Sequence, residues 1–279
     1  MKYKKKKKRL NKKNDNKKIK EKNIEIKKSH NKKAKKTETI KTKENIENSE
    51  QISQEKGEEK KVFAKGICFQ KLFLIFVIGC VVGTYYEQIL YLVRNYIDYG
   101  TIVWESRRGV IYGPFSPIYG AGAVLFTWIF ARKKYKPWEV FIYGALIGGG
   151  FEYLISFLQE TFIGTRSWDY SHMLLNINGR TNIPYMFFWG LCCMIYICYF
   201  YPKISNLIEK IPYKIGNKIV TFLVIFLSID MLVSWTALFR QTLRREGIPP
   251  FTPIGEFYDY YYNDEFLHHY FPNMVPSNK

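Results

Sequence analysis

Two glutamates lie inside long apolar stretches of this sequence, where a carboxylate is a costly side chain. Each glutamate follows two glycines in steps of four residues: Gly79 and Gly83 precede Glu87, and Gly144 and Gly148 precede Glu152. In a helix, steps of four keep side chains on one face, so the glycines would admit a neighbouring helix and the carboxylate would point into a bundle. An ionised side chain within a membrane span costs at least ~2.5 kcal/mol, so it needs a partner, a wet cavity or a proton.

Two interpretations of these acids follow. In the functional one, Glu87 and Glu152 are proton or cation sites in a polar pocket, and loop arginines act as their counter-charges or bind an anion. In the structural one, buried ion pairs only fix the register of the helices. At ~1.5 Å per residue, both acids lie roughly 20 Å from the cytoplasmic ends of their helices. They would therefore share one depth, just beneath the loops that carry Arg107, Arg108, Asp169 and Arg180.

The elements that must position these acids are five apolar stretches, each near the ~20 residues that cross a bilayer as a helix. They cover residues 72–92, 117–131, 138–158, 183–201 and 219–239. The sequence therefore predicts an all-α membrane protein with five transmembrane helices. Pro114 and Pro117, with the glycines around them, predict a bent re-entry of the chain into the membrane before the second stretch.

Charge at the ends of the stretches predicts the orientation. The short connection 132–136 carries four basic residues, and the link 202–218 carries four lysines, whereas the longer loops 93–116 and 159–182 carry fewer for their length. The positive-inside rule places the two basic connections in the cytoplasm and the long loops outside. With an odd number of spans, the N-terminus is cytoplasmic and the C-terminus extracytoplasmic.

The spacing around the two acids recurs beyond the glycines. Pro117 follows Glu87 by 30 residues, and Pro184 follows Glu152 by 32, each at the start of the next apolar stretch. One interpretation is a duplication that yields two parallel helical hairpins, followed by one further helix. The other is chance, since such spacings recur in glycine-rich membrane helices.

The strongly basic composition belongs to an N-terminal tail. Residues 1–65 hold 25 Lys and Arg against 10 Asp and Glu, so only +4 of the net charge of +19 remains for residues 66–279. We predict a disordered, Lys-rich cytoplasmic tail over 1–65, a transmembrane domain over 66–240 and an aromatic-rich extracytoplasmic segment over 241–279. The tail either attracts anionic lipid or is a solvated segment that only enforces topology. Because the charge is not spread over a folded surface, nucleic acid is not an expected partner.

Motifs for metals and nucleotides are not found in the sequence. The five cysteines form no CxxC pair, HExxH does not occur, and the phosphate-binding pattern GxxxxGK[ST] is missing. We expect no metal and no cofactor, and any ATP hydrolysis would belong to a separate ATP-binding subunit.

The outer loops contain further candidate binding residues. Asn176, Asn178, Gly179 and Arg180 suggest a tight turn that presents amide groups and a guanidinium, a surface suited to a phosphate, carboxylate or sugar. Together with Glu87 and Glu152, the candidate substrate or ion-binding residues are Arg108, Glu160, Asp169, Asn178 and Arg180.

Several ordered strings carry a family resemblance. They are Arg108-Gly-Val-Ile-Tyr-Gly-Pro-Phe-Ser-Pro-Ile-Tyr-Gly-Ala-Gly122, then Glu152-Tyr153, Glu160, Trp168-Asp-Tyr-Ser171 and Asn176-Ile-Asn-Gly-Arg180. Over about residues 72–240 the chain resembles the bacterial ABC-transporter permease family labelled CmpB-like or type IV. The resemblance implies an integral multi-pass membrane protein with a role in transport. A permease must contact its ATPase, and the amphipathic link 204–215 is the segment available for that contact.

These observations favour a permease-like protein of the cell membrane with a polar, outward-facing site and an unknown cargo. One alternative is a membrane-embedded enzyme that acts on lipid or cell-wall precursor headgroups, with Glu87 or Glu152 as acid or base. Another is a membrane scaffold or sensor with the tail as its docking arm. The enzyme is the less favoured interpretation.

Overall fold

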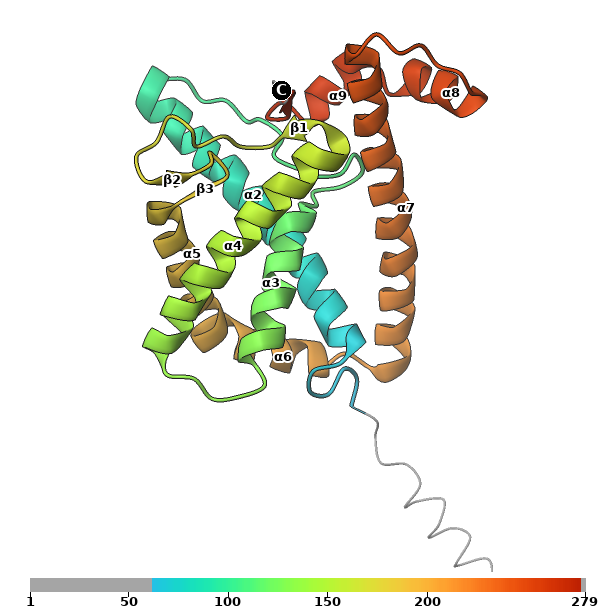
Figure 1. Ribbon diagram of the computed structural model, residues 1–279. Coiled ribbons are helices and arrows are strands. Elements are labelled where there is room, and N and C mark those ends of the chain that lie inside the picture. The colour runs from blue at the N-terminus through green and yellow to red at the C-terminus, as the bar shows by residue number, and fades with distance from the viewer. Residues whose placement is uncertain (1–61, 277–279) are drawn as a thin grey trace, which may run out of the picture. The chain divides into compact units, whose positions relative to one another are not determined.

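The computed structural model of this chain describes residues 62–276, so residues 1–61 of the predicted Lys-rich tail lie outside the described residues. The described part is mostly helical, as predicted, and its elements are shown in Figure 1. The helices are α2 (Phe69–Tyr99), α3 (Pro117–Phe130), α4 (Pro137–Ile163), α5 (Ile183–Ile195), α6 (Tyr201–Glu209), α7 (Tyr213–Arg245), α8 (Pro253–Tyr261) and α9 (Asp264–Tyr270). A π-helical turn at Tyr196–Phe200 joins α5 to α6.

Two short antiparallel ladders fasten the loops between the helices. Strand β1 (Thr165–Arg166) pairs with β4 (Val275–Pro276), so the C-terminal residues are tied to the loop that follows α4. Strand β2 (Asn176–Ile177) pairs with β3 (Thr181–Asn182) across the turn that the sequence predicts at Asn178 and Gly179.

Within residues 62–276, four helical segments are long and apolar enough to cross a membrane. They are Phe69–Tyr99, Pro137–Ile163, Ile183–Glu209 and Tyr213–Arg245. This agrees with a multi-pass membrane protein. Helix α3 is apolar but has only 14 residues, so the count of five spans stays a prediction.

Helix α3 is short because the chain enters the bundle before the helix begins. The Ser116 amide donates a hydrogen bond to the Cys80 carbonyl (3.2 Å), and Cys80 lies ~17 Å along α2 from its first residue. The segment 105–116, which we call the re-entrant segment, therefore descends between the helices, as its prolines and glycines predict. Its backbone groups need partners from protein or water there, because lipid supplies none.

The connections divide between the two ends of the bundle (Figure 1). At the loop end lie residues 100–116, residues 164–182 and the C-terminal helices. At the basic end lie the short connections 131–136 and 210–212 and the start of α2. The basic residues that the sequence assigns to the cytoplasmic side are at the basic end.

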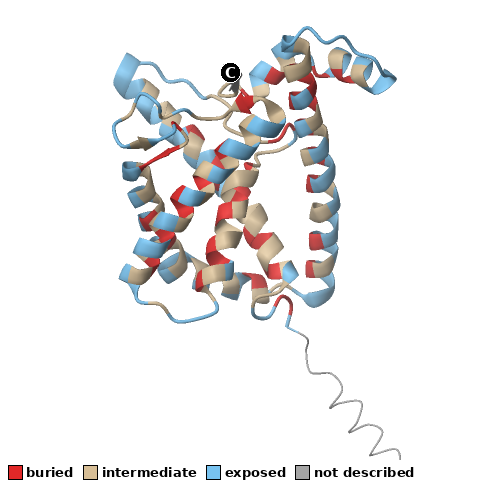
Figure 2. Cartoon of the chain, in the orientation of Figure 1, coloured by how far each residue is buried: buried red, intermediate tan, exposed pale blue. Residues whose placement is uncertain are grey.

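Glycines lie at the contacts between α2 and α3 and between α4 and α5. Helix α2 packs mainly on α3, and α4 packs mainly on α5. A Cβ at Gly79 would come within 3.0 Å of Gly120 on α3, and one at Gly144 would come within 2.6 Å of Cys193 on α5. Small residues let the backbones approach closely, which maximises van der Waals contact where lipid provides no hydrophobic drive. Buried residues accordingly follow the inner faces of these helices in Figure 2.

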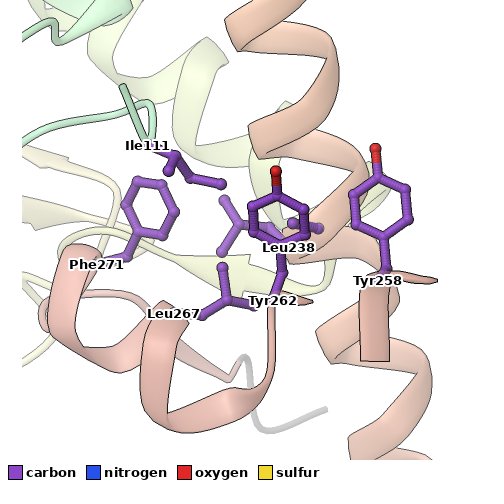
Figure 3. Packing of buried hydrophobic residues seen from close by; sticks show 7 residues of the cluster. Ile111, Leu238, Tyr258, Tyr262, Leu267 and Phe271 are labelled. Carbon is purple, nitrogen blue, oxygen red and sulfur yellow. The ribbon is translucent and has the colours of Figure 1, made fainter. Parts of the chain in front are cut away.

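The C-terminal segment folds over the loop end of α7. Figure 3 shows Tyr258, Tyr262, Leu267 and Phe271 gathered with Leu238 of α7 and Ile111 of the re-entrant segment. Helices α8 and α9 begin with the local caps Thr252 and Asn263, whose side chains accept the amides of Gly255 and Phe266. Some of the aromatic residues of the predicted segment 241–279 thus form a small hydrophobic core with Leu238 and Ile111.

Phe63 and Ala64 pack against the helices that follow them in the chain. Phe63, which the sequence places in the disordered tail, is 1% exposed and packs directly against Gly216 of α7. Ala64 is buried beside it in the same cluster. These two residues therefore pack with the helices, because an aromatic side chain just before the first apolar stretch finds a glycine surface there.

Candidate functional site

Glu87 lies half-buried on α2 and faces α3. Its Oε1 accepts a hydrogen bond from the Tyr119 hydroxyl (2.7 Å). The ring of Tyr119 covers Gly83, one turn before Glu87, so closely that a Cβ at Gly83 would overlap it. The glycine therefore sets the position of the tyrosine, and the tyrosine holds the acid.

Glu152 is more completely enclosed, at 5% exposure. Its two oxygens accept hydrogen bonds from the Tyr170 hydroxyl (2.9 Å) and the Thr181 hydroxyl (2.7 Å), and the side chain of Trp189 interacts with the same carboxylate. Burial, followed by the Glu152 charge, raises the pKa of Tyr170, so the phenol stays protonated and donates. Glu152 thus joins α4 to the loop at 164–182.

The surroundings of the two acids correspond. In each hairpin an aromatic residue of the second helix covers the second glycine of the first helix and contacts the glutamate one turn later. Tyr119 does this over Gly83, and Trp189 does it over Gly148. The rings of Tyr119 and Trp189 lie 5.9 Å apart, so the two sites adjoin.

Glu160, Arg166 and Arg180 form an ion cluster at the loop end, in which Asp169, 3.9 Å from Arg166, is the second carboxylate. The Glu160 carboxylate pairs with Arg166 (2.8 Å) and with Arg180 (2.5 Å). The hydrogen bond to Glu160 raises the pKa of Arg166, which remains a cation. Because Arg180 is already neutralised by Glu160 and also lies over the Tyr153 and Phe157 rings, its first role is to hold the loop on α4.

Asp169 and Asn178 belong to an exposed turn beside this cluster. The Asp169 carboxylate accepts both the hydroxyl and the amide of Ser171, which lowers its pKa. Asn178 and Gly179 have φ angles of +52° and +67°, and a side chain at Gly179 would collide with Ser171. Asn178 donates to the Tyr153 hydroxyl (2.9 Å). These groups mainly bond to each other.

Arg107 and Arg108 lie on the re-entrant segment. Arg107 pairs with Glu105 (3.1 Å) and stacks on the Tyr91 ring (3.9 Å). Arg108 donates to the Ser106 hydroxyl (3.0 Å) and the Ile111 carbonyl (3.2 Å), and it lies 5.0 Å from the centre of the Tyr270 ring. No carboxylate within the described residues forms an ion pair with Arg108.

A cavity of about 1070 Å³ connects several of these residues. We call it the inter-helix cavity, and it is lined by residues of α2, α3, α4 and α7, the segment 107–109, the loop 167–170, and Asn273 and Met274. Of the candidates from the sequence, Glu87 and Arg108 line it. Glu152 adjoins it through Tyr170, which is a lining residue. Glu160, Asp169, Asn178 and Arg180 are not among its lining residues.

A further carboxylate within the long apolar helices, Asp230, is not among the residues that the sequence pattern predicted. Asp230 of α7 is 2% exposed, and its Oδ1 accepts the Tyr112 amide (3.1 Å) and the Ser234 hydroxyl (3.2 Å), while Ser234 accepts the Ile111 amide (2.8 Å). Asp230 thereby satisfies backbone groups that the re-entrant segment carries into the bundle. The signal was present, because Asp230 is a carboxylate inside the apolar stretch 219–239.

Within residues 62–276, no cluster of three or more His, Cys, Asp or Glu side chains could hold a metal ion. All five cysteines, which lie in the described part, are free thiols.

Comparison with known proteins gave one result. The model of the family described as "Putative ABC-transporter type IV" matches residues 74–235. The resemblance carried by the loop strings is thereby confirmed. No curated protein matches the chain, and neither does any solved structure.

Proposed function

Because this chain belongs to the ABC-transporter type IV family, we propose that it is the membrane-spanning component of a transport system whose binding site is the inter-helix cavity. The observation that carries this proposal is that Glu87 and Arg108 both line one cavity toward the loop end. A carboxylate and a guanidinium within the membrane are energetically costly unless they bind a ligand or form an ion pair with each other. These two form no ion pair, which favours a ligand.

The orientation supports an outward-facing site. The connection 131–136 and the lysines after α6 lie together at the basic end, which the positive-inside rule assigns to the cytoplasm. The inter-helix cavity lies toward the opposite, loop end, since Arg94, Asp98 and Asn273 are among its lining residues. A solute that enters from outside would therefore pass Arg94 and Asp98 before it reaches Glu87, which lies further along α2 toward the basic end.

Within this site the two glutamates have different expected roles. Glu87 has one hydrogen-bond donor and lines the cavity, so we propose it as the proton or cation site. Glu152 has a full set of donors, so we propose that it positions Tyr170 on the wall of the cavity.

A separate ATP-binding subunit would dock at the basic end. Helix α6 presents Leu207, which is 63% exposed, while Ser205 and Glu209 of the same helix bind the buried Lys71 of α2. Lys71 ties α6 to the helix that carries Glu87. Movement of α6 by a bound subunit would thus be transmitted along α2 to the cavity.

The test is purification of the full-length chain with a C-terminal affinity tag from native membranes, followed by measurement of ATPase activity. We expect an ATP-hydrolysing subunit to co-purify, and Leu207→Glu to remove it while the chain still inserts. Leu174→Glu is a matched control, since Leu174 is also highly exposed but lies in the loop 164–182.

Failure to recover ATPase activity with the wild-type chain would contradict the permease role. Loss of the subunit in both leucine variants would contradict docking on α6. The predicted attraction of the Lys-rich tail to anionic lipid is separate, and it concerns residues outside the described part.

A further inference from the structure

The walls of the inter-helix cavity are largely apolar, although its charged residues suggested a polar pocket. Along α4 and α7 the lining side chains are Ile155, Leu158, Phe162, Met231, Trp235 and Leu238. A small hydrated ion would leave these side chains in contact with water. A ligand with a hydrocarbon body would cover them, since removal of apolar surface from water is favourable.

The charged residues of the cavity leave one cation without an ionic partner. Three arginines and two carboxylates line it, and of these Arg94 pairs with Asp98 (3.6 Å). Arg107 is neutralised by Glu105, outside the lining. Within the described residues Arg108 has no ion-pair partner. Its electrostatic neighbour is Asp230, whose Oδ1 accepts hydrogen bonds from the Tyr112 amide and the Ser234 hydroxyl and whose Oδ2 is buried without a hydrogen-bond partner in this part of the chain.

From this arrangement we propose that the inter-helix cavity binds an anionic amphiphile, with its phosphate or carboxylate head on Arg108 and its hydrocarbon body along α4 and α7. This proposal rests on the proposed function, because it names the class of molecule that the same site takes. Arg108 can donate charge-assisted hydrogen bonds to an acidic oxygen, and these are the stronger kind.

The geometry of Arg108 suits this role. Its Nε and Nη1 atoms bond to Ser106 and to the Ile111 carbonyl, which fixes the plane of the guanidinium, and the Tyr270 ring lies on one side. The segment that carries it is held in turn by Asp230 and Ser234 of α7. The cation is therefore positioned before a ligand arrives, which reduces the ordering cost of binding.

Binding can be measured by tryptophan quenching, because Trp235 and Trp168 line the cavity. The full-length chain in a neutral detergent is titrated with 12-bromododecanoate, whose bromine quenches nearby indoles, and with 12-bromododecanol, which has the same chain without the charge. The alcohol reports insertion into the micelle. We expect saturable quenching by the acid beyond that of the alcohol, and we expect Trp235→Phe to remove most of the excess.

Three variants separate the head from the body of the ligand. Arg108→Gln should weaken binding of the acid by about tenfold or more and leave the alcohol unchanged, because it removes charged hydrogen bonds. Arg132→Gln is the matched control, an arginine that stacks on Trp128 at the basic end. Leu158→Phe narrows the cavity at its apolar wall and removes no hydrogen bond, so it should lower the affinity for the acid. This variant tests the site independently of any effect of Arg108→Gln on the fold.

Equal quenching by the acid and the alcohol in the wild-type chain would overturn the proposal. Equal effects of Arg108→Gln and Arg132→Gln, together with no effect of Leu158→Phe, would overturn it as well. If inorganic phosphate displaces the acid at the same concentration as dodecyl phosphate does, the site binds a free anion. That result would overturn the proposal of an amphiphilic ligand.

The outcome for the ligand is distinguishable from that for the proposed function. ATPase activity that co-purifies with the chain, in the absence of amphiphile binding, would retain the transport role and reject this ligand class. Amphiphile binding without any ATP-binding subunit would retain the ligand and reject the permease.

Discussion

At the scale of single residues, three carboxylates within the helices have three different environments. Glu152 accepts two hydroxyl hydrogen bonds and is nearly unexposed. Asp230 holds the backbone of the re-entrant segment. Glu87 has a single tyrosine donor and lines the inter-helix cavity. A buried acid that is saturated with donors fixes structure, and an acid with a free face toward a cavity is available to a ligand.

The two predicted glutamates should therefore respond differently to the same substitution. We expect Glu152→Gln to destabilise the protein by about 1–2 kcal/mol, because two hydroxyl donors lose their charged acceptor, and Glu87→Gln to cost less than about 1 kcal/mol. Melting temperatures of the two variants in mild detergent measure this difference. Equal losses would show that Glu87 is as much a structural residue as Glu152.

At the scale of elements, the glycines decide how closely the helices of each hairpin approach. A methyl group at Gly83 would overlap the Tyr119 ring, which holds Glu87. A methyl group at Gly150 would meet no atom within 4 Å outside its own helix neighbourhood. Alanine at Gly83 therefore tests packing, whereas alanine at Gly150 tests only the intrinsic helix propensity of the residue.

Substitution of these glycines tests the contact between α2 and α3. We expect Gly83→Ala to destabilise the protein by about 1–3 kcal/mol, the usual cost of overpacking, and Gly150→Ala to leave stability unchanged or slightly raised. Thermal unfolding followed by circular dichroism gives both values. A neutral Gly83→Ala would mean that Tyr119 can move aside, and Glu87 would then not depend on this packing.

An acidic residue of α8 joins this helix to α7. Asp259 binds Arg240 (2.7 Å) and Arg244 (2.7 Å) of α7, and the hydrogen bond to Arg240, followed by that to Arg244, lowers its pKa. A pKa lowered on folding contributes stability above the ordinary aspartate value of ~3.9, and this contribution is lost as the pH falls through the folded-state pKa.

Acid should therefore weaken the attachment of α8 to α7. We expect faster hydrogen exchange in α8 at about pH 3 than at about pH 6, after correction for intrinsic rates, because below the ordinary aspartate pKa of ~3.9 the opened state binds a proton on Asp259 that the paired state resists. The Asp259→Asn variant should exchange rapidly at both pH values. Unchanged protection of α8 in that variant would show that the aromatic cluster alone holds the helix.

At the scale of the whole molecule, the predicted orientation determines which side the inter-helix cavity serves. Both basic connections lie at one end of the bundle and the cavity lies toward the other. Fusion of alkaline phosphatase after the described C-terminus should give an active enzyme, because that phosphatase matures outside the cytoplasm. Fusion after Lys134 should be inactive. The reverse pattern would place the cavity on the cytoplasmic side.

Hydropathy and charge are local properties, so the sequence by itself determined the apolar helices, the basic end and the family. Residue spacing likewise predicted the glycine faces and the bent re-entry before α3. The structure agrees that the protein is mostly helical and has several spans; the five-span count, the duplication and the orientation stay predictions.

Only the tertiary structure decided which charged residues meet. Arg180 is neutralised by Glu160, 20 residues away, and Asp230 binds a segment more than 100 residues earlier in the chain. Phe63 is buried by a glycine of α7. Such partners are set by the packing of distant elements, which spacing along the chain does not encode. For the same reason the apolar walls of the cavity, and with them the proposed ligand, became visible only once α4 and α7 were placed beside α2.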